Sequence, residues 1–425
     1  MHRLRIARPK CPLAESCRGA YDNAVAALAW QHVGIESNAL IDGPRAWLVA
    51  GAAFAANFVT FGVLFSFGIF LKPFMDEFDR SEGTVAGIFS AAVLIYYVGG
   101  AVGGRVGDRL TVRPVVAFGA VTMTVGLLLS SRATAVWQLY LVYPPLVGIA
   151  VGCCYPPMIG VVGRWFSARR ALSISIVLTG VAAGTSLGPI VSQALIEAYG
   201  WRTTLLSYGL VAAVVLGAAA LLSGAPPTEE PAASVSLSVL ARSARFRRLY
   251  LALMLISPGF YMPLVFLKNY AEDEGISGGK AAMLVGLVGA TSAISRPIIG
   301  SFGNRFDPLR QYRISYLMML SGLIVWLFAG SSYPVLVLMA VIHGVGWAVW
   351  VTAAPAVLAE WFGVRDLGGV LGAFYTGLGL GALAGPAVSG FVVVNWGYGW
   401  AISMVIVTST LAVAVAFAPM EMRDC

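Results

Sequence analysis

One arginine lies where a charge is expected to be inside a lipid bilayer. Arg296 stands about 15 residues into the apolar run 281–300, which corresponds to ~20 Å along a helix. That run contains no acidic residue to neutralise the charge. Because a charge at such depth is costly and usually marks the path of a substrate or an ion, Arg296 predicts an anion site. The alternative is an arginine that reaches the interface or is satisfied by backbone carbonyls.

Other candidates for the lining of that site come from helical spacing and from polarity within apolar runs. Two helix faces carry them: Asn57, Phe61 and Phe65 at i, i+4 and i+8, and His343, Trp347 and Trp350 at i, i+4 and i+7. Tyr143, Tyr375 and Thr376 are further polar positions in apolar helices. Aromatic residues at this spacing can equally serve helix packing, and both interpretations remain open.

His343 is the candidate for proton coupling. The middle of the predicted spans contains no Asp or Glu, so His343 is the one side chain there whose unperturbed pKa is close to neutrality. It either carries the coupled proton or stays neutral and shapes the pocket. A third alternative is that the substrate carries the proton after it pairs with Arg296.

The composition is that of a polytopic membrane protein. Of 425 residues, 58% are hydrophobic and 11% are charged, against about one quarter charged in a soluble domain. Apolar stretches of near 20 residues predict twelve spans: 46–71, 84–104, 113–131, 137–161, 170–197, 203–223, 249–268, 281–303, 313–331, 333–359, 367–394 and 397–418. The expected connections carry 15 Lys and Arg residues on one side and 6 on the other. This bias places both termini in the cytoplasm and argues against nucleic acid as the partner of the basic residues.

The two halves of the chain resemble each other. Phe70-Leu71-Lys72 repeats 196 residues later as Phe266-Leu267-Lys268, and Trp165-Phe166 repeats as Trp361-Phe362. Such a parallel repeat predicts two six-helix bundles, 46–223 and 249–418. A cytoplasmic linker, 224–248, joins them, and a cytoplasmic extension, 1–45, and a tail, 419–425, complete the chain. The basic part of the linker is expected to touch lipid headgroups.

No constellation for catalysis or metal binding is visible. The five cysteines lack metal-ligand spacing, no nucleophile–base arrangement occurs, and the phosphate-binding Gly-x-x-x-x-Gly-Lys-Ser/Thr pattern is missing. The sequence therefore predicts neither an enzyme nor an ATP-driven pump, and no cofactor.

The segment Gly104–Arg113 (GRVGDRLTVR) resembles the signature loop of the major facilitator superfamily. That resemblance implies an all-α membrane protein with twelve transmembrane helices in two bundles. It also implies that Asp108, with Arg105 and Arg109, belongs to a cytoplasmic gate. Thr111 departs from the family pattern, in which a glycine is usual.

A narrower resemblance is to the proton-linked monocarboxylate transporters. Its segments are Asp42–Trp47 with Ser66–Lys72, and Phe166–Leu172 followed by Gly180, Gly184 and 199–202. Arg296-Pro297 resembles the pair that binds the substrate carboxylate in that family. Ser292 stands where some members have an aspartate, Phe65 where some have a lysine, and Thr352 near a small hydroxyl residue of the family.

The function implied is secondary active transport of a small monocarboxylate such as lactate or pyruvate, coupled to a proton by symport. One central cation favours a substrate with one carboxylate, since a second negative charge in a low-dielectric cavity is costly. The alternatives are an organic anion exchanger or exporter of the oxalate/formate type, or a membrane sensor that does not transport. The expected location is a plasma or inner membrane, crossed several times.

Overall fold

A computed structural model describes residues 41–109, 111–166, 169–224, 237–302, 307–362 and 367–418. Residues 1–40 of the extension, 225–236 of the linker and the tail 419–425 lie outside these ranges. The helices are α2 (Pro44–Phe65), α3 (Phe67–Phe78), α4 (Glu82–Arg109), α5 (Val112–Ser130), α6 (Val136–Trp165), α7 (Arg170–Leu222), α8 (Leu237–Arg242), α9 (Ala244–Asp273), α10 (Gly278–Phe302), α11 (Pro308–Leu327), α12 (Tyr333–Phe362), α13 (Leu367–Trp396) and α14 (Tyr398–Phe417).

These helices account for the twelve predicted spans. Ten stretches of the described chain are long and apolar enough to cross a membrane. One of them, Leu172–Leu222, holds two crossings, because its 51 residues would extend about 75 Å as one helix. The backbone breaks at Gly200, whose φ of 78° lies in a region that favours glycine. The remaining crossing is α11, which carries Arg310 and Arg313 in its first turns.

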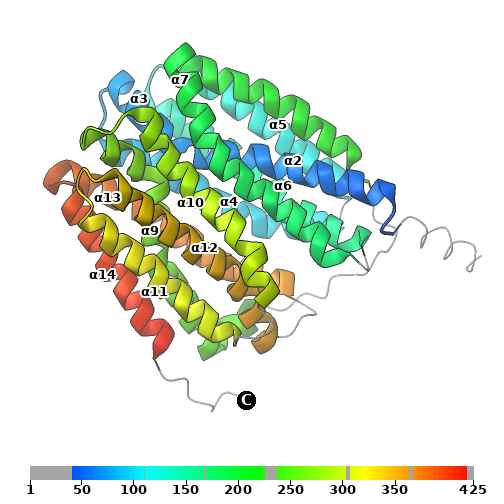
Figure 1. Cartoon of the computed structure of the whole chain (residues 1–425). Coiled ribbons are helices and arrows are strands. Elements are labelled where there is room, and N and C mark those ends of the chain that lie inside the picture. The colour runs from blue at the N-terminus through cyan, green and yellow to red at the C-terminus, as the bar shows by residue number, and fades with distance from the viewer. Residues whose placement is uncertain are drawn as a thin grey trace, which may run out of the picture.

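The chain forms two bundles that lie side by side, α2–α7 and α9–α14 (Figure 1). We call the end at which α2 begins and α7 ends the linker end. The opposite end holds the turn between α3 and α4 and the break at Gly200, and we call it the turn end. The predicted fold class is therefore confirmed, with two helical bundles of six crossings each.

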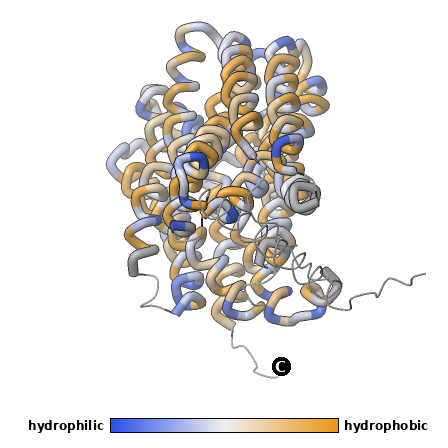
Figure 2. Tube along the Cα trace, turned by 90° about the vertical axis from the view of Figure 1, so that its right-hand side faces the viewer, coloured by the Kyte–Doolittle hydropathy of each residue, from blue (hydrophilic) through white to orange (hydrophobic). Residues whose placement is uncertain are grey.

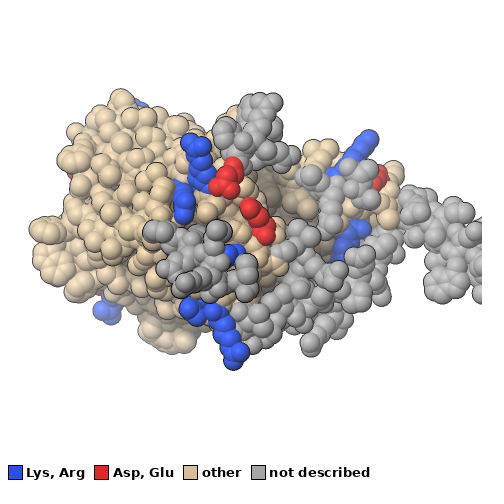
Figure 3. Space-filling model, turned by 90° about the horizontal axis from the view of Figure 1, so that it is seen from below, with Lys and Arg blue, Asp and Glu red and all other residues tan. Residues whose placement is uncertain are grey.

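Hydropathy follows the helices. Hydrophobic residues predominate along them, and hydrophilic residues gather toward the ends (Figure 2). Many large apolar side chains on the outer faces are exposed, such as Val214 and Phe328, as expected for surfaces that contact lipid. Lys and Arg side chains stand at several places on the linker end (Figure 3), where Arg45, Arg113 and Arg310 are exposed.

The first crossing bends at Ser66, between α2 and α3. The Ser66 hydroxyl donates to the Gly62 carbonyl at 2.5 Å, a bond that often bends helices. Prolines inside α6, at positions 144, 145, 156 and 157, likewise remove backbone donors. Membrane helices tolerate such residues where neighbouring helices and side chains satisfy the freed carbonyls.

At the turn end the two bundles meet closely. A Cβ at Gly68 of α3 would lie 2.5 Å from the Leu264 carbonyl oxygen of α9. A Cβ at Gly83 of α4 would lie 2.6 Å from the Phe391 nitrogen of α13. Backbones this close leave no passage between the helices, so the structure is closed at the turn end. Small residues at such crossings are typical of membrane helix packing.

Candidate functional site

Arg296 lies on α10 at the interface between the bundles. Its Nη1 donates to the Leu178 carbonyl of α7 at 3.3 Å, and its Nη2 donates to the Ser292 hydroxyl at 3.3 Å. The Nε atom is buried and has no hydrogen-bond partner among the described residues. Neither ion pair of the described residues includes this arginine. The guanidinium therefore keeps donor capacity for an anion.

Aromatic rings surround this cation. The guanidinium carbon lies 5.7 Å from the Trp347 ring centre, within the range of a cation–π contact. Trp347 packs edge-on against Phe65 of the other bundle, at 5.9 Å between ring centres. Tyr155 of α6 and Tyr375 of α13 lie close enough to Arg296 to interact with it electrostatically. Rings that exclude water strengthen the attraction between a cation and an anion.

Several residues predicted from the sequence come together here. Ser292 contacts Arg296 directly, and Trp347 and Tyr375 lie beside it. Trp350 lies beside Tyr375, at 5.8 Å between ring centres. Phe65 reaches across the interface to Trp347.

Phe61 belongs to the wall of the N-terminal bundle. Its ring centre lies 5.0 Å from that of Tyr155 and 5.8 Å from that of Phe65. It therefore connects the first crossing to the tyrosine that lies beside Arg296.

Other predicted residues have no described contact with Arg296. Asn57 is fully buried in α2, donates to the Ala53 carbonyl at 2.8 Å, and has a side-chain oxygen without a described partner. Tyr143 packs against Phe67. Thr352 donates to carbonyls of its own helix. Each stays a prediction as a lining residue.

His343 is buried within the C-terminal bundle. Its backbone and Cβ face Gly322 of α11, and it lies one turn before Trp347 on α12. The Nδ1 atom has no hydrogen-bond partner among the described residues. His343 therefore lies one helical turn from Trp347, and its role in proton coupling stays a prediction.

Three tyrosines at the interface were not predicted. Tyr97 of α4 and Tyr261 of α9 join the two bundles through their hydroxyls at 2.9 Å. Tyr155 completes the surroundings of Arg296. Their positions in the middle of apolar runs were a usable signal, because a buried tyrosine hydroxyl requires a polar partner.

The predicted gate residues Arg105, Asp108 and Arg109 lie at the end of α4. Their side chains are outside the part of the chain that the structure describes, so their role stays a prediction. Within the described residues, no group of three or more His, Cys, Asp or Glu side chains could hold a metal ion.

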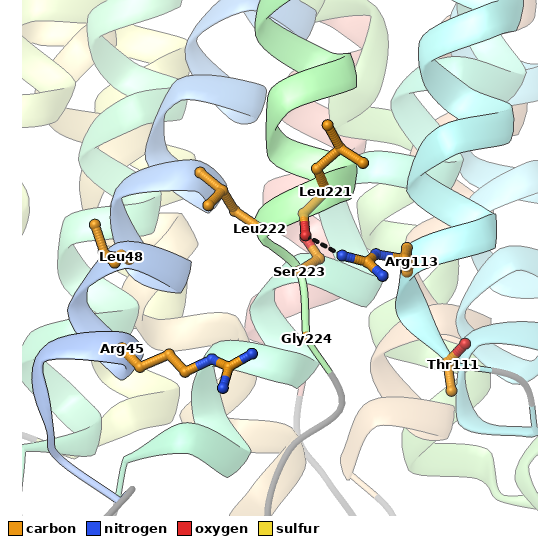
Figure 4. Close-up of a pocket in the computed structure, with 8 residues that line it drawn as sticks. All are labelled: Arg45, Leu48, Thr111, Arg113, Leu221, Leu222, Ser223 and Gly224. Carbon is orange, nitrogen blue, oxygen red and sulfur yellow. Dashed lines mark hydrogen bonds between the residues drawn. The ribbon is translucent and has the colours of Figure 1, made fainter.

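A separate pocket of about 380 Å³ opens at the linker end of the N-terminal bundle, between α2, α5 and α7. Arg45 points into it, and Arg113 donates to the Leu221 carbonyl at 2.5 Å (Figure 4). Arg113 is thereby occupied in tying α5 to the end of α7. This pocket lies on the outside of one bundle, whereas Arg296 lies between the two.

Comparison with known proteins places this architecture in a class. The family model described as Major Facilitator Superfamily matches residues 53–311 and 249–423. Two solved structures share the fold at 15% sequence identity and cover 88% of this chain. A mutant of the nucleoside transporter NupG has a TM-score of 0.70 with 98% of its chain covered. A bacterial homologue of the human lysosomal transporter Spinster, inward-facing and unoccupied, has a TM-score of 0.71 with 96% covered.

Curated relatives are closer in sequence. Monocarboxylate transporter 11 of Homo sapiens is 32% identical over 374 residues, which cover 83% of this chain and 78% of the relative. Monocarboxylate transporter 13 of Rattus norvegicus is 29% identical over 362 residues, 83% of each chain. MFS-type transporter 1 of Ophiocordyceps sp. is 25% identical over 365 residues, 84% of this chain and 81% of the relative. The chain belongs to the monocarboxylate transporter family of the major facilitator superfamily, and it is a multi-pass membrane transporter rather than an enzyme.

Proposed function

We propose that this protein carries a small monocarboxylate across a membrane together with a proton, by rocking its two bundles around Arg296. The observation that carries the proposal is a guanidinium with a free, buried Nε donor and no described acidic partner, held among aromatic rings. Two relatives are named monocarboxylate transporters.

The chemistry of the site fits such a substrate. A guanidinium offers two parallel donors that match the two oxygens of a carboxylate, and it stays protonated. The rings of Phe65, Trp347 and Tyr375 would contact the short apolar body of the same molecule. Ser292 stands where an acid would otherwise neutralise the arginine. The charge of Arg296 is therefore left for the substrate.

We further propose that the linker end faces the cytoplasm of a plasma or inner membrane, with both termini on that side. The excess of basic residues in the connections at this end supports the orientation. Arg105, Asp108 and Arg109 would then close the cytoplasmic side during the cycle.

Uptake of labelled acids into proteoliposomes under an imposed pH gradient tests the function. A proton symporter accumulates lactate or pyruvate when the outside is acidic. An anion exchanger requires a counter-substrate inside, and a sensor shows neither behaviour. Uptake that is insensitive to the pH gradient but requires internal anion would contradict symport.

Selectivity provides a further prediction. We expect lactate and pyruvate to compete with each other for uptake, whereas succinate and oxalate leave uptake unchanged. A second carboxylate would enter the ring of aromatic residues without a second cation, which costs several kcal/mol. Inhibition constants measured at pH 7 check this, and strong inhibition by oxalate would favour the exchanger.

The role of His343 is tested by His343→Gln. If His343 carries the coupled proton, accumulation driven by a pH gradient is lost, while exchange of labelled for unlabelled substrate continues. Exchange persists because it does not require the empty carrier to return. If the imidazole only shapes the pocket, both modes fall together. Unchanged accumulation in this variant would remove His343 from the mechanism.

A further inference from the structure

A second ionisable side chain lies between the bundles, far along the chain from Arg296. Glu82 begins α4 of the N-terminal bundle, and only 4% of its surface is exposed. Its Oε1 accepts hydrogen bonds from Asn269 Nδ2 of α9 at 3.2 Å and from the Tyr398 hydroxyl of α14 at 2.9 Å. Both donors belong to the C-terminal bundle. One carboxyl group therefore joins three helices across the interface at the turn end.

The backbone next to this carboxyl group seals it from water. Gly83 and Gly390 approach so closely that a Cβ on Gly390 would lie 2.5 Å from the Gly83 Cα. The hydrogen bonds of Glu82 and this glycine contact belong to the same closed arrangement. When the bundles separate at the turn end, both hydrogen bonds must break and the carboxyl group must meet water.

The charges around Glu82 do not compensate an ionised carboxylate. On α9, Lys268 pairs with Glu272 at 2.9 Å, and the exposed Asp273 interacts electrostatically with Lys72 of α3. Those two cations and two anions balance one another. Glu197 of α7 adds negative charge close to Glu272, since both carboxylates lie within 3.3 Å of a Cβ position at Gly278.

Arg80, in the turn before α4, is exposed, and α13, α14 and α6 bring no cation to Glu82. The sequences of α13 and α14 contain no charged residue, and α6 contributes Tyr140, which donates to the Thr84 carbonyl. The two partners of Glu82 are neutral donors. A buried carboxylate without a cation is costly, and a bound proton removes that cost while Oε1 keeps both hydrogen bonds.

We propose that Glu82 is a proton-binding site that controls closure of the turn end. The carboxyl group takes up a proton from the solution at the turn end before the bundles close there, and it returns the proton to the same solution when they open. The proton does not cross the membrane. The inference therefore goes beyond the proposed symport and stands or falls independently of it.

The direction of the pH response follows from the linkage between proton binding and closure. Closure that takes up one proton is favoured by acid, and the ratio of closed to open protein falls by at most about tenfold for each unit of rising pH. The side chain of Glu82→Gln has the same length and keeps an acceptor oxygen, but it cannot ionise. This variant should therefore stay closed at every pH.

The conformational equilibrium can be measured directly. Spin labels at Tyr199→Cys and Ser331→Cys, in protein whose native cysteines are replaced, report the distance between the bundles at the turn end. Both positions are exposed and belong to different bundles. Pulsed electron paramagnetic resonance between pH 5 and 9 should show closed protein in acid and increasingly open protein as the pH rises.

Three variants complete the test. Glu82→Gln should abolish the pH response and leave the protein closed, whereas Tyr398→Phe should shift the equilibrium toward open at each pH and keep the response. Glu274→Gln, which changes an exposed carboxyl group at the same end, should respond as the unmodified protein does. The inference is overturned if the labelled protein does not respond to pH, if Glu82→Gln responds normally, or if Glu82→Gln is open.

Discussion

Replacing Arg296 with lysine is expected to lower transport strongly although the positive charge is kept. An ammonium group cannot present two parallel donors to a carboxylate, and lysine has no counterpart to the Nε donor that lies buried at the interface. Hydrogen bonds to charged groups contribute about 1.5–3 kcal/mol each, so loss of the paired geometry should lower uptake on the order of 100-fold. Arg296→Ala should lower it further.

Initial rates of lactate uptake, normalised to correctly inserted protein, measure this effect. Arg313→Lys is a matched control, because Arg313 is also partly buried and donates to a backbone carbonyl, that of Ala416, at the linker end. We expect this control to transport at nearly the normal rate. Near-normal uptake by Arg296→Ala would contradict the assignment of the site.

Gly68→Leu is expected to stop turnover by a different route. At this position α3 crosses α9, and a Cβ would meet the Leu264 carbonyl oxygen at 2.5 Å and the Val265 carbonyl oxygen at 2.8 Å. Both obstacles are backbone atoms, which cannot move as a flexible side chain does. A leucine should therefore hold the bundles apart at the turn end, and Gly68→Ala should have an intermediate effect.

The expected signature is loss of transport with retention of binding. Substrate added from the turn end should still bind, because the variant stays open on that side, while uptake and exchange both fall to background. Gly51→Leu is the control on α2, since nothing lies within 4 Å of a Cβ at that exposed position. Normal transport by Gly68→Leu would show that this close contact is not required in the cycle.

The sequence predicted the crossings because each requires a long apolar run, and the bilayer imposes that pattern whatever the neighbouring helices are. The depth of Arg296 in an apolar run indicated the charge between the bundles, and the family resemblance indicated Ser292 one helical turn before it. The two crossings within α7 were also predicted as separate spans, because Glu197 and Arg202 interrupt the apolar run on either side of the break at Gly200.

Glu82 was missed because the predicted span began at residue 84 and left the carboxyl group outside. An acid at the edge of a span is ordinarily exposed to water, and only the packing of α9, α13 and α14 buries this one. The same limit applies to Tyr97 and Tyr261. Their hydroxyls meet across 164 residues of sequence, and helical periodicity within one span carries no information about such a pair.

The hydrogen bond between Arg296 and the Leu178 carbonyl competes with the substrate for one donor, and it therefore lowers the measured affinity for the substrate. A peptide oxygen of the opposite bundle already occupies one guanidinium donor, at 3.3 Å. An incoming carboxylate that uses this donor displaces an internal ligand, so the measured dissociation constant reflects an exchange of partners. A modest affinity is then compatible with a strong contact between arginine and carboxylate. Differences in affinity among substrates report that contact more directly than the affinity of any one of them.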